Sequence, residues 1–224
     1  MCVLGMQDTK VTIIIPHYNE PVEWLSRAIE SALRQKGITK EVIVIDDHSV
    51  EDPRAQIQSY NITYIRHASN QRLSAARNTA IAAAQGEWII SLDSDDYFSD
   101  DYVLEKLLKH EEDADVLYGN LITENDRRLT PNKQIHDEDW EGNNQIYATS
   151  MFRKSLWEQV GGFWVRDEAF PEDWDFWWRA WNTGARFYYV PVDVYYHTYR
   201  KDSEWERMKS RFPYFKELIT KHVL

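Results

Sequence analysis

Three aspartates lie within four residues, directly after the apolar run at residues 88–92: Asp93, Asp95 and Asp96. Such a run is typical of a buried strand, and parallel sheets usually bind ligands beyond the carboxyl ends of their strands. Carboxylates held this close repel one another and need raised pKa values, basic partners or a divalent metal. No basic residue lies between positions 87 and 105, which favours a metal. Oxygen ligands suit Mn²⁺ or Mg²⁺, and either ion could bridge the carboxylates to a substrate diphosphate.

Other interpretations of this acidic stretch can be compared with the residues. A solvated turn, with an acid at position 100 or 101 capping the next helix, remains an alternative. A calcium EF-hand loop starting at the first aspartate would require Gly and Glu where the chain has Phe98 and Leu104. An aspartyl-phosphatase motif would require Gly and Thr where the chain has Asp96 and Tyr97. Both of these motifs fit badly.

Composition narrows the class of protein. The 224 residues, 43% hydrophobic and 14% aromatic, suffice for one large α/β domain. The net charge of -11 argues against a nucleic-acid surface, which would need clustered Lys and Arg. Cys2 is the single cysteine, which excludes an intrachain disulfide and fits a reducing compartment. Without a signal-peptide pattern or a run of membrane-spanning length, we expect a cytoplasmic protein that could touch the inner face of a membrane.

Strands and helices are predicted to alternate along the chain. Pro16 should stop the first strand. Residues 119–145 are polar enough for a loop or irregular hairpin, which either contacts an acceptor or is merely solvated. The alternation predicts a mostly parallel sheet flanked by helices, with its strand ends gathered in one cleft. Strands are expected at 11–15, 41–45, 62–65, 88–92, 115–118 and 187–190, and helices after 20, after 53, at about 73–84, at 155–160 and at about 172–181.

Four segments, in this order, resemble the family 2 glycosyltransferases. The resemblance covers roughly residues 10–200 and implies a GT-A fold that transfers a sugar from a nucleotide diphosphate with inversion. It divides a single domain, 1–224, into a nucleotide-binding part (about 10–118), an acceptor and catalytic part (about 119–200) and a helical tail (about 203–224). The segments are Ile15-Pro16-His17-Tyr18-Asn19-Glu20, Val44-Ile45-Asp46-Asp47-His48-Ser49, Ala75-Ala76-Arg77-Asn78 through Leu92-Asp93-Ser94-Asp95-Asp96, and Gly161-Gly162-Phe163 through Glu172-Asp173-Trp174-Asp175-Phe176.

The resemblance implies roles for the donor-binding residues. Asp47 would accept a hydrogen bond from the base, or else cap a helix. Arg77 would lie near the base or diphosphate, or else form a surface ion pair. Asp95 and Asp96 match positions that touch ribose and metal. The nucleoside pocket would include Pro16, Tyr18 and Glu20, with the tyrosine ring as a stacking face.

Asp173 falls on the family's catalytic base. Inversion requires a base on the face of the anomeric carbon opposite the leaving diphosphate, to take the proton of the attacking hydroxyl. Glu172 is the neighbouring candidate, and helix capping is the structural alternative for either acid. The tryptophans that follow could include a sugar-stacking platform, but most should be core: Trp174, Trp177, Trp178 and Trp181.

Two departures from the family pattern affect the details. The chain has Asn70-Gln71-Arg72 where the family often has a glycine after the asparagine, so the turn should differ. A histidine that contacts metal or diphosphate usually lies near the end of the domain. His197 is our choice for that metal ligand, with Arg200 and Lys201 as alternates facing the diphosphate.

Apolar and basic residues alternate at helical spacing in the tail. The apolar stripe could meet a membrane carrying a lipid-linked acceptor, or a second subunit in a homodimer, but packing onto the domain is favoured. Pro213 should kink this helix. The stripe comprises Trp205, Met208, Phe212, Phe215 and Ile219.

The sequence therefore predicts a metal-dependent inverting glycosyltransferase that uses a nucleotide-diphospho-sugar, most simply a UDP-sugar, in polysaccharide biosynthesis. Its acceptor could be a saccharide, a lipid-linked oligosaccharide or a protein. One alternative is a sugar- or nucleotide-binding module without turnover. Another is a nucleotidyltransferase, which would normally show a glycine-rich basic loop where residues 16–20 have none.

Overall fold

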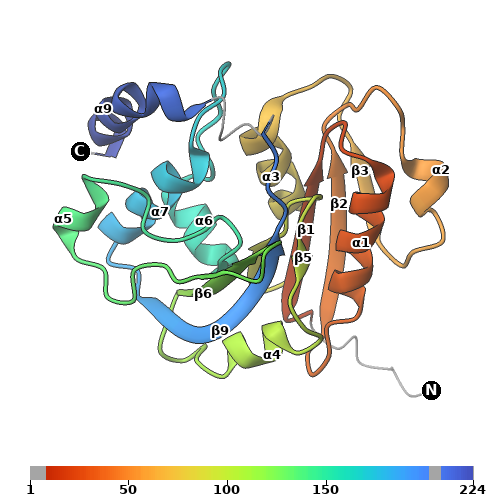
Figure 1. The fold of residues 1–224 in the computed structure, drawn as a ribbon, viewed down its shortest axis with the longest axis horizontal. Coiled ribbons are helices and arrows are strands. Elements are labelled where there is room, and N and C mark those ends of the chain that lie inside the picture. The colour runs from red at the N-terminus through yellow and green to blue at the C-terminus, as the bar shows by residue number, and fades with distance from the viewer. Residues whose placement is uncertain (1–8, 202–207, 224) are drawn as a thin grey trace.

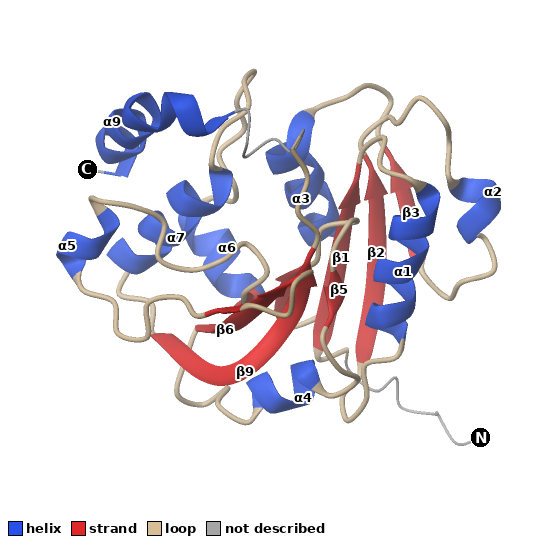
Figure 2. Cartoon of the chain, viewed as in Figure 1, coloured by secondary structure: helices blue, strands red, loops and turns tan. Residues whose placement is uncertain are grey.

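One mixed sheet runs through the molecule, with helices on both of its faces (Figures 1 and 2). The computed structural model describes residues 9–201 and 208–223. The strands lie in the order β3-β2-β1-β4-β8-β6-β9-β5, and β7 pairs with β6. Their bounds are β1 Val11–His17, β2 Lys40–Asp46, β3 Thr63–Arg66, β4 Trp88–Ser91, β5 Tyr97–Phe98, β6 Val116–Thr123, β7 Arg128–Leu129, β8 Met151–Arg153 and β9 Phe187–His197.

The helices follow the strands in the predicted alternation through the first half of the chain. The short helices α2 and α5 and the 3₁₀ turn η1 add single turns at the periphery. The bounds are α1 Val22–Leu33, α2 Arg54–Ile57, α3 Arg72–Ala83, α4 Val103–Leu108, α5 Asp137–Trp140, α6 Lys154–Val160, α7 Glu172–Asn182, η1 Lys209–Arg211 and α9 Phe212–Val223.

The first four strands form the parallel half of the sheet. β1 pairs in parallel with β2 and β4, and β2 with β3, as the βα alternation predicts. Alternate residues of β1 face opposite cores: Ile13 and Ile15 pack with α1 and α4, whereas Ile14 packs on the side of α3. Burial on both faces explains why β1, β2 and β4 contain continuous apolar runs, whereas β3, at the edge of the sheet, is partly exposed.

Pro16 does not stop β1, contrary to our prediction. The strand continues through Pro16 to His17, pairing with β2 to the end. Ile14 O accepts from Leu92 N at 2.9 Å, so the backbone of Ile14 faces β4. Backbone groups two residues apart in a strand face the same neighbour, so the nitrogen of Pro16 also faces β4, which has already ended at Ser91. On the other side, His17 O accepts from Asp47 N at 2.9 Å. The missing N–H of proline therefore interrupts no ladder bond.

The second half of the sheet contains antiparallel pairs and longer strands than we predicted. β8, which we did not predict, lies antiparallel between β4 and β6. β6 and β9 continue through Gly119 and Pro191, past the ends we expected, because the register shifts there. A Cβ at Gly119 would lie 2.6 Å from Val192 O, so the bulge needs glycine. β9 curves strongly (Figure 1) and ends against β5. It ends beside the turn that carries Asp93, Asp95 and Asp96, which we call the acidic turn.

The polar region 119–145 contains the predicted irregular hairpin. β6 turns back into β7, where Leu121 pairs with Leu129. The chain then forms α5, which the sequence did not indicate because the helix has one turn. A loop from residue 141 leads back to β8. This region therefore leaves the sheet after β7 and rejoins it at β8.

The tail packs onto the domain, which confirms the favoured expectation. Met208, Phe215 and Ile219 are buried in the core cluster that includes α7. The ring of Phe212 stacks on Trp174 with centroids 5.2 Å apart. Trp205 lies outside the described residues.

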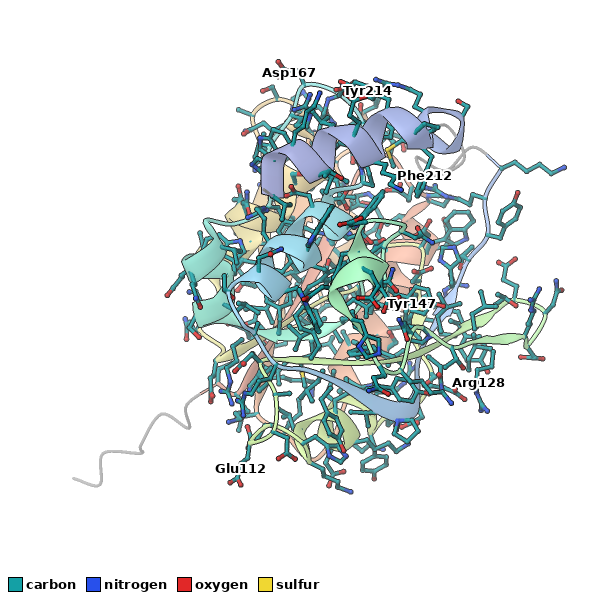
Figure 3. All side chains as sticks on the ribbon, turned by 90° about the vertical axis from the view of Figure 1, so that its left-hand side faces the viewer. Glu112, Arg128, Tyr147, Asp167, Phe212 and Tyr214 are labelled. Carbon is teal, nitrogen blue, oxygen red and sulfur yellow. The ribbon has the colours of Figure 1, made fainter. Side chains whose placement is uncertain are left out.

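Pro213 is the second residue of α9, where a missing N–H costs no helical bond. In the described residues it therefore stands at the start of a helix, whereas we had predicted that it would kink one. On the same helix, Tyr214 donates to Glu168 Oε1 at 3.2 Å, which ties α9 to the loop between α6 and α7. Figure 3 shows Tyr214 and Asp167 of that loop at the same end of the molecule. Among the described helices, none has the length and apolar character required to cross a bilayer.

Candidate active site

The acidic turn lies where the sequence placed it, between β4 and β5. Asp95 is partly buried, and its Oδ2 lies 3.0 Å from Nε of Arg200. Glu20 contacts the same guanidinium, with its Oε1 3.4 Å from Arg200 Nη2. Burial, and then the neighbouring carboxylates Asp96 and Asp93, raise the pKa of Asp95 to about 7, although Arg200 opposes this. Arg200 thus partly neutralises one end of the acidic turn.

Asp96, the last residue of the acidic turn, is buried against the end of β9. Its Oδ1 accepts from the backbone N–H of Thr198 at 2.9 Å, and its Oδ2 lies 3.3 Å from His197 Nδ1. Burial raises the pKa of Asp96, while His197 and Thr198 work in the opposite direction. The hydrogen bond to Asp96 raises the pKa of His197, so the imidazole tends toward its charged form.

Arg77 is buried, so the alternative of a surface ion pair is wrong. Its Nη2 donates to Asp93 Oδ1 at 2.9 Å and its Nε to Ser91 Oγ at 3.1 Å. Its Nη1 forms an ion pair with Glu172, at the start of α7. Burial disfavours the charge on Arg77, but Asp93, Glu172 and Asp173 outweigh it and raise the arginine pKa. Arg77 therefore joins α3, the acidic turn and α7.

These contacts correct the argument that led us to a metal. We took the lack of nearby basic residues in the sequence to favour a bound cation, but Arg77 and Arg200 reach the acidic turn from distant parts of the chain. Within the described residues, no three His, Cys, Asp or Glu side chains converge as metal ligands do. Three of the predicted ligands, Asp93, Asp95 and Asp96, nevertheless share one turn, and His197 at the end of β9 lies beside Asp96. Their oxygen and imidazole groups are of the kinds that bind Mn²⁺ or Mg²⁺.

Asp47 caps the start of α3, in agreement with the alternative that we kept open. Its Oδ1 accepts from Gln71 N at 2.8 Å and lies 2.7 Å from His67 Nδ1. Its Oδ2 accepts from Arg72 N at 2.7 Å. Arg72 has φ 71°, so a non-glycine residue occupies a left-handed turn with support from this carboxylate. This explains how the chain omits the glycine often found in the family here.

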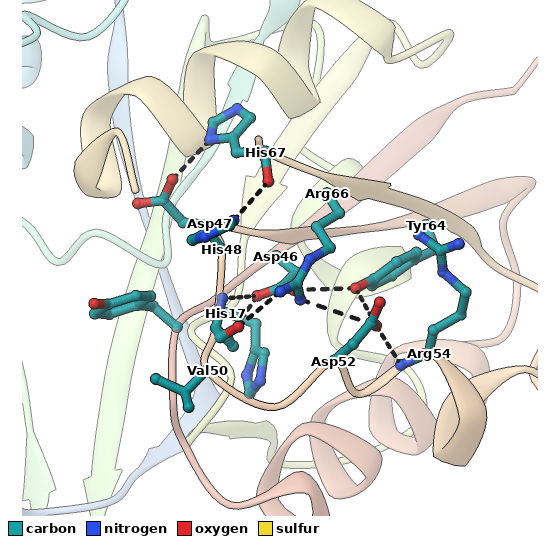
Figure 4. Close-up of polar contacts among 12 residues, drawn as sticks. His17, Asp46, Asp47, His48, Val50, Asp52, Arg54, Tyr64, Arg66 and His67 are labelled. Atoms are coloured by element: carbon teal, nitrogen blue, oxygen red, sulfur yellow. Dashed lines mark hydrogen bonds and ion pairs between the residues drawn. The ribbon is translucent and has the colours of Figure 1, made fainter. Parts of the chain in front are cut away.

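Asp46 and Asp47 point to opposite sides of the β2 end (Figure 4). Asp46 is fully buried and forms an ion pair with Arg66. The hydroxyl of Tyr64 also donates to Asp46 Oδ2, at 3.1 Å. Asp46 therefore holds β2 to β3, and Asp47 is the acid that faces α3.

Glu20 connects the loop after β1 to the acidic turn. Its Oε2 accepts from Tyr18 N at 2.8 Å and from Ser94 Oγ at 3.3 Å. Tyr18 is 45% exposed, so its ring is accessible for stacking. Of the predicted nucleoside residues, Tyr18 and Glu20 thus lie on the loop after β1, beside the aspartates, and Pro16 lies near the end of β1 itself.

The two acids at the start of α7 differ in their surroundings. The carboxylate of Glu172 is buried and is used by Arg77. Asp173 is half-buried, and its Oδ2 accepts from Asn144 Nδ2 at 2.7 Å. Burial, and next the charge of Glu172, raise the pKa of Asp173 to about 7. Burial raises the pKa of Glu172 too, but its carboxylate is enclosed and paired with Arg77, so Asp173 is the more accessible of the two acids.

The tryptophans of α7 are mostly core, as expected. Trp174, Trp177 and Trp178 are buried, and Trp181 is half-buried, with its Nε1 donating to Asp137 Oδ1 at 2.7 Å. None of the three buried indoles offers a face for sugar stacking.

Sequence reasoning missed the residues that join the motifs to one another. Asn78 Oδ1 accepts from Phe163 N at 2.8 Å and from Trp157 Nε1 at 2.9 Å. Gly162 has φ 81°, and a Cβ there would lie 2.9 Å from Asn78 Oδ1. The signal available in the sequence was that Arg77-Asn78 and Gly161-Gly162-Phe163 both belong to the motifs that resemble the family. Asn144 had no signal beyond its place in the polar region.

Strands that end in an acidic turn, beside a helix that begins with acids, are typical of α/β enzymes that bind substrates beyond the carboxyl ends of their strands. Residues 12–174 match the model of Glycosyl transferase family 2, and the chain belongs to this family.

Among related proteins, the succinoglycan biosynthesis protein ExoO of Rhizobium meliloti is 42% identical over 89 residues, covering 38% of this chain and 25% of ExoO. The uncharacterized glycosyltransferase YwdF of Bacillus subtilis is 29% identical over 185 residues, covering 76% of this chain and 68% of YwdF. The chain spans a quarter or less of ExoO and of two Rickettsia glycosyltransferases that it also matches.

Solved structures confirm the predicted GT-A fold. S. aureus TarS 1-349 in complex with UDP-GlcNAc superposes with a TM-score of 0.74 at 22% identity, covering 88% of this chain and 61% of that one. The same fragment in complex with UDP superposes with a TM-score of 0.70.

Proposed function

We propose that this chain transfers a sugar from a UDP-sugar to an acceptor hydroxyl with inversion, and that Asp173 is the general base. Burial raises the pKa of both carboxyls, that of Asp173 to about 7. The observation that carries the proposal is the difference between their partners, because Glu172 is paired with Arg77 whereas Asp173 accepts from the neutral amide of Asn144. A base works best when its pKa is near the working pH. The oxygen of the acceptor hydroxyl would form a bond to the anomeric carbon while its proton passes to Asp173. The bond between the anomeric carbon and the UDP oxygen would break, and UDP would leave.

Donor binding is proposed for the loop after β1 and the end of β2. Tyr18 offers an exposed ring for stacking on the base. The carboxylate of Asp47 has about four lone-pair sites. Three of its sites are used by His67, Gln71 and Arg72, which leaves one for a uracil N–H. The UDP and UDP-GlcNAc complexes of TarS support this choice of nucleotide.

A divalent ion is proposed as a cofactor. Asp93, Asp95 and Asp96 would hold it together with His197, which lies beside Asp96, because they combine oxygen and imidazole donors. When bound, Mn²⁺ or Mg²⁺ would supply positive charge for the departing diphosphate. Arg200, already beside Asp95, is the arginine best placed to face that diphosphate, with Lys201 as its neighbour.

The proposed acceptor is a saccharide. The name of the relative ExoO, a succinoglycan biosynthesis protein, supports this class over a protein acceptor. The region between β6 and β8 would contact it, since Asn144 of that region touches Asp173.

Thermal unfolding with UDP, GDP, CDP or TDP, each with and without Mn²⁺, tests donor and metal together. We expect UDP with Mn²⁺ to stabilise most, by about 2.7 kcal/mol at about 100 times the dissociation constant. Asp95→Asn should lose the Mn²⁺-dependent part of the shift. Asp126→Asn, in the exposed turn between β6 and β7, should behave as wild type. If no nucleotide raises the midpoint, the donor assignment is wrong.

A further inference from the structure

The side chain of Asn144 reaches Asp173 from the loop that follows α5. Its Nδ2 lies 2.7 Å from Asp173 Oδ2, a short distance for an amide donor on a carboxylate. The two residues are 29 positions apart in the chain. The contact therefore depends on the way this loop folds back onto the start of α7.

The loop is held firmly around Asn144. Gln145 Nε2 donates to the carbonyl oxygens of Asp139 and Asn143, both at 2.7 Å. The backbone N–H of Asn144 donates to Asn143 Oδ1 at 2.9 Å, and Ile146 is buried. The amide is thus presented to Asp173 by a braced segment rather than by a free loop tip.

The other end of the amide has no partner in the described part of the chain. Asn144 Oδ1 is buried and accepts no hydrogen bond there. A buried acceptor without a donor costs stability. The reverse orientation would bring Oδ1 against Asp173 Oδ2, and two acceptors repel when the acid is ionised. Asn144 therefore serves the carboxylate of Asp173 and contributes poorly to the fold.

We propose that Asn144 is the positioning residue of the base: its Nδ2–H holds the carboxylate of Asp173 ionised and in place, at a cost to stability. The inference rests on the proposed function of Asp173. The charged groups that face Asp173 are Glu172 on the same helix, Asp93 on the acidic turn and Arg77 on α3. The two acids favour the protonated form and Arg77 opposes them. A neutral donor favours the ionised form without adding a charge to this crowded group.

Asn144→Leu tests the proposal, because it removes both the donor and the unpaired oxygen at similar volume. We expect the midpoint of thermal unfolding to stay the same or to rise. The titration of the Asp173 carboxyl, followed by ¹³C NMR of the protein without ligands, should move to higher pH by about one unit, a tenfold change in its ionisation constant. The acidic limb of the pH profile for hydrolysis of UDP-GlcNAc should move by the same amount.

Asn144→Asp is the second variant, since it keeps the shape of the side chain. It replaces the donor by an acid, so the titration of Asp173 should move further upward. Asn125→Asp, the same change in the exposed turn after β6, is the matched control and should leave that titration unchanged.

The outcomes separate the positioning role from the proposed function. An unmoved Asp173 titration in both Asn144 variants would overturn the inference, even if hydrolysis fell. A lower unfolding midpoint in Asn144→Leu with an unmoved titration would identify Asn144 as a structural residue. A moved titration in a protein that hydrolyses no UDP-GlcNAc would support the contact and count against UDP-GlcNAc as the donor.

Discussion

Asp173→Asn is expected to lower sugar transfer by about 10²-fold or more while nucleotide binding persists. The amide is nearly isosteric with the carboxylate, and its oxygen can still accept from Asn144, so the start of α7 should keep its geometry. What is lost is the ability to take a proton from the acceptor hydroxyl. Because the pKa of Asp173 is raised to about 7, wild-type transfer should increase as the pH rises through that value and the acid ionises. Release of UDP and of product, measured between pH 5 and 9, checks both statements.

Asp167→Asn is the matched control for this experiment. Asp167 is exposed on the loop before α7, so the same chemical change there should leave transfer and its pH profile unaffected. Unchanged transfer in Asp173→Asn would remove Asp173 from its role. Loss of nucleotide binding together with transfer would instead identify Asp173 as a helix cap.

Arg77→Met should destabilise the fold by about 3–5 kcal/mol, because it leaves buried acid without its partner. Glu172 is 7% exposed and depends on this guanidinium, and Asp93 loses the same partner. The acids that Arg77 balances would then repel one another at the junction of α3, the acidic turn and α7. Urea unfolding of the protein without ligands, monitored by near-UV circular dichroism, measures the loss.

Arg186→Met supplies the comparison for a surface ion pair. Arg186 pairs with Asp115 but its side chain is 53% exposed, so this change should cost only about 0–1 kcal/mol. Adding Glu172→Gln to Arg77→Met should recover part of the stability, since the buried charge is then removed as well. A cost for Arg77→Met no larger than that for Arg186→Met would show that the buried network contributes little.

The position of the acidic turn could be predicted from the sequence, but the partners of its acids could not. Apolar runs predicted β1, β2 and β4, and the position of Asp93 to Asp96 after β4 followed from them. The partners of those acids were not predictable in the same way. Arg200 is more than one hundred residues from Asp95 in the chain, and the pairing of the end of β9 with β5 brings it there.

Strand ends were wrong where a local signal was overridden by pairing. The strands expected at 115–118 and 187–190 stop just before Gly119 and Pro191, yet both strands continue through a shared irregularity of register. Pro16 was misjudged for a related reason, since its effect depends on which neighbour its nitrogen faces.

By itself, the sequence determined the alternation of strands and helices, the family, and the acids that gather at the strand ends. These properties depend on hydrophobic periodicity and on the spacing of a few residues, which are local in the chain. Tertiary structure alone decided the partner of each acid: Arg77 pairs with Glu172 and Asp93, whereas the side-chain partner of Asp173 is the neutral amide of Asn144. Such pairing depends on burial and on contacts between residues far apart in the chain, which no spacing pattern encodes.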